Sequence, residues 1–160
     1  MDKLYIIYVD DQREVLSTLS KDLQVFEKFL NVEECESAAE AMDIINELDA
    51  EGDRLAVIIS DHIMPGKSGV DFLIEINNDG RFMQTKKMLL TGQATHQDTI
   101  TAINQASIEK YIEKPWKSED LITSVKVLLT QFIFDAGLNY EPFTEILDQP
   151  TLYNYLRKKV

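Results

Sequence analysis

Five short apolar stretches alternate with amphipathic ones along this chain, and this alternation restricts its fold more than any other feature. The apolar stretches cover residues 4–9, 32–35, 55–60, 87–91 and 109–112. Short runs of this kind are typical of strands that are buried on both faces of a sheet. Strands that alternate with helices indicate an α/β fold: a doubly wound, five-stranded parallel sheet with helices on both faces. Right-handed crossovers would then place all five strand ends at one edge.

The stretches between the strands have the spacing of helices. Apolar residues recur from residue 15 to residue 30, which predicts one amphipathic helix there. Cap-like residues predict where the other four begin: Ser37 with Glu40, Ser68 with Asp71, Thr95 with Asp98, and Ser118 before two acids. Glutamates within residues 32–35 favour the edge of the sheet over its centre for the second strand.

We expect a main domain over residues 1–136 and a C-terminal extension over residues 137–160. Gly137 fits just past a helix end, and Pro142 follows a little beyond it. Leu152, Tyr155 and Leu156 predict a further short helix in the extension. Three roles stay open for it: packing back on the domain, binding a partner or dimerising, or leading into a linker.

Composition narrows the classes of partner. The formal net charge of −12 argues against direct binding to nucleic acid or to an anionic membrane, because both need a basic surface. The same charge is compatible with cation binding and with protein partners. The single cysteine excludes an internal disulfide, and no apolar segment approaches the length that crosses a bilayer. We therefore expect a cytoplasmic protein.

Chemically active side chains stand at the predicted strand ends. Asp10 and Asp11 follow the first strand and Asp61 the third, while Thr91 and Lys114 end the fourth and fifth. Clustered carboxylates repel one another unless a cation intervenes, and hard oxygen ligands suit Mg²⁺. A lysine and a hydroxyl can hold a phosphoryl group, and a carboxylate can accept one as an acyl phosphate. This edge of the sheet is therefore predicted to bind phosphate on Asp61.

These residues also carry a family resemblance. Asp10-Asp11, residues 61–69, Leu90-Thr91-Gly92 and residues 111–115, taken together, resemble a response-regulator receiver domain of two-component signalling. The similarity spans residues 3–134. It implies the flavodoxin-like strand order 2-1-3-4-5, which chemotaxis regulators of this family also have.

The resemblance implies a metal set. Asp61 would be the phosphoacceptor, and Mg²⁺ (or Mn²⁺) would bind directly to Asp11, Asp61 and the backbone carbonyl of Ile63. Asp10 would act on the ion mainly through water. At the position two residues after Asp61, Ile63 replaces the small polar residue that is commonest in this family.

The resemblance also implies the parts of a switch. Lys114 would pair with the phosphoryl group, and the Lys114–Pro115 peptide would be cis. Thr91 would move to bond the phosphoryl group, and Tyr111 would be the aromatic switch that turns inward with it. The chain would catalyse only its own phosphotransfer and dephosphorylation.

The implied partners are a sensor histidine kinase or phosphotransfer protein, and an output domain or partner protein downstream. A homodimer would use the face formed by the fourth helix, fifth strand and fifth helix.

The alternative function is an aspartate-nucleophile phosphohydrolase of the haloacid-dehalogenase type, which needs an acid where Ile63 stands. A flavin- or nucleotide-binding flavodoxin relative ranks lowest, because Asp10-Asp11 occupies the turn that would face a phosphate.

Overall fold

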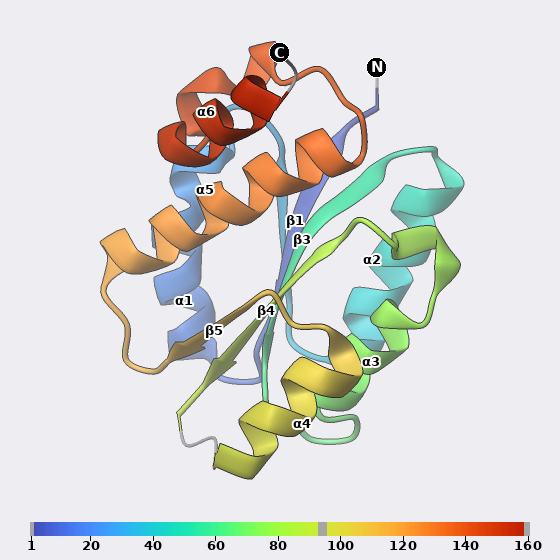
Figure 1. Ribbon diagram of the computed structural model, residues 1–160. Helices are drawn as coiled ribbons and strands as arrows, with labels where there is room; N and C mark the ends of the chain where they lie inside the picture. Colours follow the sequence, from blue (N-terminus) through green and yellow to red (C-terminus); the bar gives the residue numbers. More distant parts are fainter. Residues whose placement is uncertain (1, 93–95, 159–160) are drawn as a thin grey trace.

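The computed structural model describes residues 2–92 and 96–158. Its centre is a five-stranded parallel sheet in the order β2-β1-β3-β4-β5 (Figure 1). The strands are β1 (Leu4–Val9), β2 (Asn31–Cys35), β3 (Arg54–Asp61), β4 (Lys86–Thr91) and β5 (Lys110–Glu113). The predicted doubly wound sheet and its strand order are confirmed.

Helices cover both faces of this sheet. They are α1 (Arg13–Asp22), α2 (Ala38–Ala50), α3 (Gly69–Asn77), α4 (His96–Ala106), α5 (Ser118–Asp135) and α6 (Gln149–Lys158). Figure 1 shows α1 and α5 on one face and α2, α3 and α4 on the other. Because side chains alternate along a strand, Ile6 joins the core under α1 and α5, and its neighbour Ile7 joins the core under the other three helices.

The first helix differs from its prediction. The expected helix over residues 15–30 ends at Asp22, and the chain continues as a 3₁₀ turn, η1 (Leu23–Phe26). A 3₁₀ turn has three residues per turn, so the side chains at its two ends share one face. Leu23 and Phe26 are both fully buried. The tighter turn therefore directs both side chains into the core.

The predicted caps meet different outcomes. The hydroxyl oxygens of Ser37 and Ser68 accept the backbone N–H groups of residues 40 and 71, as expected. The prediction for Ser118 is wrong: Lys117 precedes α5 without a side-chain cap, and Ser118 is the first helical residue. Its hydroxyl instead donates to Asp22 on α1. Thr95 lies outside the described residues.

The C-terminal extension folds back against α5. Gly137 follows α5 with a φ of +71°, a left-handed conformation that favours glycine. A 3₁₀ segment, η3 (Glu141–Ile146), leads into α6, and Leu152 of α6 is buried in the core shared by α1 and α5. The Tyr155 ring stacks on Phe134 at 4.6 Å. This packing favours the first of the three roles proposed for the extension.

Within residues 2–92 and 96–158, no helix combines the length and the hydropathy needed to cross a membrane.

Candidate functional site

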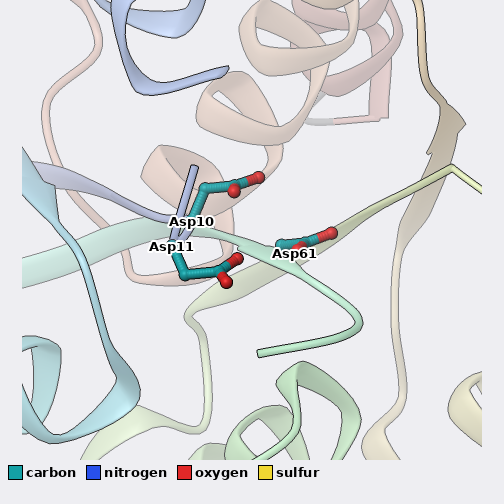
Figure 2. A group of neighbouring side chains, drawn as sticks. All are labelled: Asp10, Asp11 and Asp61. Carbon is teal, nitrogen blue, oxygen red and sulfur yellow. The ribbon is translucent and has the colours of Figure 1, made fainter. Parts of the chain in front are cut away.

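Three carboxylates gather where β1 and β3 end. Asp10 and Asp11 directly follow β1, and Asp61 is the last residue of β3. One oxygen from each lies within 4.8 Å of the other two (Figure 2). Asp10 is fully buried and Asp61 is 6% exposed, whereas Asp11 is exposed. The structure therefore brings the three predicted acids together in a cluster whose exposed member is Asp11.

Backbone hydrogen bonds fix each strand end beyond the sheet itself. The N–H of Asp10 donates to the carbonyl of Cys35, and that of His62 donates to the carbonyl of Leu90. The N–H of Lys114 donates to the carbonyl of Thr91 at 2.8 Å. The site is thus built on continuous parallel pairing, which holds its side chains more rigidly than free loops would.

Gly69, the first residue of α3, lies directly against Asp61. A Cβ atom placed on Gly69 would lie 1.6 Å from the carbonyl oxygen of Asp61. The N–H of Gly69 donates to the carbonyl of His62 at 2.8 Å, which ties α3 to the turn after β3. Only glycine fits this approach, so residue 69 fixes the distance between α3 and Asp61.

Lys114 provides the positive charge of the site. Its Nζ lies 2.7 Å from an oxygen of Asp10 and 2.9 Å from an oxygen of Asp61. Burial alone would lower the pKa of Lys114, but the two carboxylates raise it above its usual value. The Asp61 pKa is raised by burial, which outweighs the opposing hydrogen bond from Lys114, and the charge of Asp10 raises it further. Lys114 is therefore cationic, and Asp61 is held in a site that disfavours its charge.

The other predicted residues lie at or near the same edge. Thr91 ends β4, 1% exposed, one residue beyond the Leu90 that pairs with Asp61. Tyr111 lies in β5 with its ring against the core under α2, α3 and α4, and its hydroxyl donates to Glu113 at 3.2 Å. The Ile63 side chain is 69% exposed, so most of it faces solvent. The Lys114–Pro115 peptide is cis, as expected.

Asp22 is a buried polar residue that the sequence did not single out, and it contacts two residues that follow Lys114. It ends α1 and is 7% exposed. Its carboxylate accepts hydrogen bonds from Trp116 Nε1 at 2.8 Å and from Ser118 Oγ at 2.6 Å. Both donors follow Lys114 closely in the chain. No local sequence pattern predicts contacts between residues that are more than ninety positions apart.

The donor set of the pocket fits a small hard cation. Its ligands are carboxylate oxygens, which Mg²⁺ prefers, and the exposed Asp11 leaves room for the waters that Mg²⁺ retains. Mutual repulsion among three carboxylates favours any cation that enters. The residues present are therefore compatible with the Mg²⁺ site that the sequence predicts.

Comparisons with known proteins agree with this geometry. The family model for the response regulator receiver domain matches residues 6–126. The hydrogenase transcriptional regulatory protein HoxA of Cupriavidus necator is 31% identical over 121 residues, which are 76% of this chain and 23% of HoxA. The transcriptional regulatory protein CpxR of Escherichia coli is 27% identical over 124 residues, or 78% of this chain and 48% of CpxR. The chain thus spans less than half the length of these curated relatives.

Solved structures agree on the fold. A CheY-like response regulator receiver domain protein from Methanospirillum hungatei superposes with a TM-score of 0.70 at 24% identity, covering 84% of this chain and 99% of that one. The signal receiver domain of an HD domain-containing protein from Pseudomonas fluorescens gives a TM-score of 0.70 at 23% identity, covering 81% and 97%. With the family model matching most of its length, this chain belongs to the response-regulator receiver domains.

Proposed function

We propose that this chain is a phosphorylation-dependent signalling switch in which Asp61 accepts a phosphoryl group. The observation that supports this most directly is the position of Asp61, 2.9 Å from the ammonium of Lys114 and beside Asp10 and Asp11. An Asp61 oxygen forms a bond to phosphorus while the bond between phosphorus and the donor breaks, and the donor group leaves with the electron pair. The product is an acyl phosphate.

The metal would be held by the chain's own oxygen ligands. We propose direct bonds from Asp11, Asp61 and the backbone carbonyl of Ile63 to Mg²⁺ or Mn²⁺, with Asp10 acting mainly through water. When bound, the ion neutralises charge that develops on the transferred phosphoryl group. Lys114 would do the same from the other side, since its ammonium already lies against the Asp61 carboxylate.

The response to phosphorylation would pass through Thr91 and Tyr111. Thr91 ends β4, the strand beside Asp61. It directly follows Leu90, which is the residue paired with Asp61 across the two strands. Tyr111 belongs to the adjacent strand, β5, and would turn inward when Thr91 bonds the phosphoryl group. A new charge at Asp61 would in this way bias two states of the surface formed by α4, β5 and α5.

The proposed donor is a sensor histidine kinase or a phosphotransfer protein, and the proposed reader is an output domain or a separate partner protein. A homodimer through α4, β5 and α5 belongs to this proposal, and so does a cytoplasmic location. The net charge of −12 supports a chain that does not itself bind nucleic acid or membrane. Beyond its own phosphotransfer and dephosphorylation we propose no turnover. The matched family gives no support to the phosphohydrolase alternative, and Ile63 supplies no second acid.

The test is incubation of the chain with acetyl phosphate and Mg²⁺, followed by intact-mass measurement. The parent should gain one phosphoryl group that is labile in base, and a chelator should prevent the gain. Asp61→Asn should gain none, whereas Asp43→Asn, a matched change at an exposed acid on α2, should behave as the parent. Phosphate uptake by Asp61→Asn at the parent's rate would contradict the proposal.

A further inference from the structure

Asp22 is a buried acid that lies outside the cluster of Asp10, Asp11 and Asp61. It ends α1, on a different element from every residue of that cluster. Each of its two oxygens accepts one hydrogen bond, at 2.8 Å from Trp116 Nε1 and at 2.6 Å from Ser118 Oγ. A carboxylate costs free energy to bury, and here two neutral donors hold it. This cost calls for an explanation beyond ordinary packing.

The two donors lie in and just after the connection that follows Lys114: Trp116 is within it, and Ser118 is the first residue of α5. Residues 114–117 join β5 to α5, and the N–H of Lys114 anchors the beginning of this connection to the carbonyl of Thr91. Asp22 anchors its other end through Trp116 and Ser118. The backbone of Lys114 is thus held between two fixed points. Ser118 makes the second of these bonds from the first position of α5, where the preceding Lys117 supplies no side-chain cap.

We propose that Asp22 is a positioning residue for phosphoryl transfer, which acts through Trp116 and Ser118 to keep the Lys114 ammonium between Asp10 and Asp61. This inference rests on the proposed function of Asp61. Lys114 has a long flexible side chain, so its contribution depends on where its backbone is held. Asp22 supplies that constraint from α1, without touching the reacting atoms.

A positioning role and a purely stabilising role predict opposite effects on Mg²⁺ binding. Lys114 hydrogen-bonds to oxygens of Asp10 and Asp61, which belong to the cluster that would attract the ion. A loosened Lys114 competes less for these oxygens, so Mg²⁺ binds equally well or more tightly while phosphorylation slows. General loosening of the fold would weaken Mg²⁺ binding and slow phosphorylation together.

The experiment compares Asp22→Asn and Trp116→Phe with the parent chain. Phosphorylation by acetyl phosphate at saturating Mg²⁺ is followed by intact mass, and Mg²⁺ affinity is measured by calorimetry. We expect rates about 3 to 30 times lower, since a misplacement near 1 Å can cost roughly a hundredfold. Mg²⁺ affinity should stay constant or rise. Ser118→Ala should slow the reaction, and Ser118→Thr, which keeps the hydroxyl, should restore it.

Leu152→Ala is the matched control, because it removes a buried side chain on α6, which packs on α5 outside the carboxylate cluster. It should lower the melting temperature and leave rate and affinity unchanged. A double-mutant cycle combines Asp22→Asn with Lys114→Ala. Two quantities are measured for each variant: the phosphorylation rate, and the affinity for beryllofluoride by ¹⁹F NMR. Once Lys114 is gone, Asp22→Asn should cause no further loss.

Several results would overturn this inference. They are a parent-like rate in Asp22→Asn, an undiminished loss in the Lys114→Ala background, or weaker Mg²⁺ binding together with the slower rate. A parent chain that takes no phosphate on Asp61 would instead overturn the proposed function, and this inference with it. The two failures are therefore distinguishable from the parent chain alone.

Discussion

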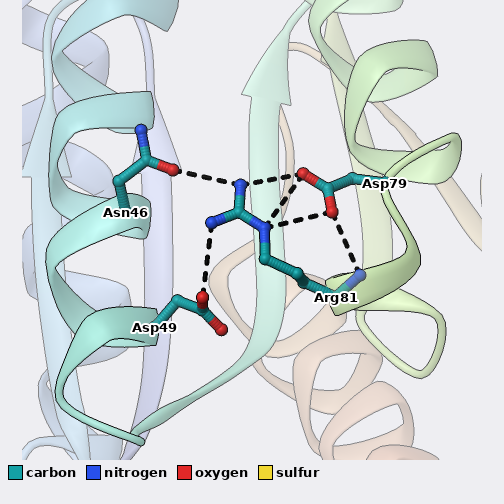
Figure 3. A network of polar contacts seen from close by, with 4 residues as sticks. All are labelled: Asn46, Asp49, Asp79 and Arg81. Carbon is teal, nitrogen blue, oxygen red and sulfur yellow. Dashed lines mark hydrogen bonds and ion pairs between the residues drawn. The ribbon is translucent and has the colours of Figure 1, made fainter.

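At the edge of the sheet where β3 and β4 begin, one arginine donates to several acceptors, whereas at the opposite edge one lysine contacts two carboxylates of a cluster of three. Arg81 donates to Asp79, Asp49 and Asn46, and thereby joins the turn before β4 to α2 (Figure 3). Lys114 contacts Asp10 and Asp61, with Asp11 beside them. Both groups hold more carboxylates than cations, but the first is partly exposed, whereas Asp10 and Asp61 of the second are buried.

The comparison distinguishes interactions that stabilise the fold, around Arg81, from buried charges that the site needs at a cost in stability, around Lys114. Arg81 is 39% exposed in its side chain, so its ion pairs contribute modestly and at little desolvation cost. Asp10 and Asp61 are almost completely buried, and burial raises the pKa of Asp61. Natural proteins tolerate such local costs where binding or catalysis depends on them. Four sets of substitutions can break or sharpen this contrast.

The largest effect is expected from a pair of glycine substitutions, one at each edge. Gly69→Ala places a methyl group where the Asp61 carbonyl oxygen stands, so the backbone must shift, at a cost of about 3 kcal/mol or more. Gly80→Ala has nothing within 4 Å of the new atom, and should change stability by less than about 1 kcal/mol. Urea unfolding of both variants gives the comparison, and equal losses would show that the two edges are packed alike.

The second-largest loss of stability is expected from Lys114→Met, because it removes the cation and leaves buried carboxylates facing one another. In a chelating buffer we expect a loss of about 2–3 kcal/mol, the lower part of the range for breaking a buried ion pair. Mg²⁺ should then stabilise the variant more than it stabilises the parent, since the ion no longer competes with the ammonium. Thermal unfolding with and without Mg²⁺ measures both quantities. A variant that is as stable as its parent in chelator would mean that the carboxylates do not repel appreciably.

Cys35 ends β2 at the same edge of the sheet as Asp10, and burial keeps its thiol neutral. Burial raises the pKa of its thiol from 9.0 to about 12. Above pH 9 the unfolded chain therefore ionises this thiol while the folded chain does not, so folding loses stability as pH rises toward 12. Relative to Cys35→Ala, the parent should lose about 1.4 kcal/mol per pH unit in that window. Denaturant unfolding at pH 8, 9 and 10 checks this, and a constant difference would refute it.

Arg81→Ala should have the smallest effect. Its contacts are partly exposed, so we expect a loss of about 1 kcal/mol that shrinks as salt is added. Arg81→Lys keeps the charge but cannot donate to three acceptors at once, and should recover part of the loss. Unfolding at low and high ionic strength tests the contrast. A salt-independent loss would indicate that Arg81 acts through its packing on Phe82 instead.

Much of this architecture follows from local patterns in the sequence. The predicted strand ends put Asp10, Asp11, Asp61 and Lys114 at one edge, because parallel strands linked by right-handed crossovers end on the same side of the sheet. In the structure, the Lys114 ammonium contacts the carboxylates of Asp10 and Asp61. The roles of Thr91 and Tyr111 remain predictions, since they concern the phosphorylated state.

What the sequence could not supply are contacts between distant segments. Ser118 has the chemistry of a cap, but it is the first residue of α5, and its hydroxyl donates to Asp22, 96 residues earlier. The helix predicted to run past residue 22 becomes a 3₁₀ turn, whose Leu23 and Phe26 pack into the core with residues from distant segments. Local propensity is a weak prior wherever tertiary packing decides the outcome.

The place where the chain begins and the extension packs has a practical consequence. Asp2 pairs with Arg54 at the start of β3, and residues 2–4 line a surface hollow together with Pro142 and Phe143. Figure 1 shows α6 and the start of β1 on the side of the molecule away from α4. A dye, an affinity tag or a surface tether attached near either described end would thus sit remote from the acidic pocket. The chain can be immobilised for single-molecule work with the face that carries Asp10, Asp11 and Asp61 left open.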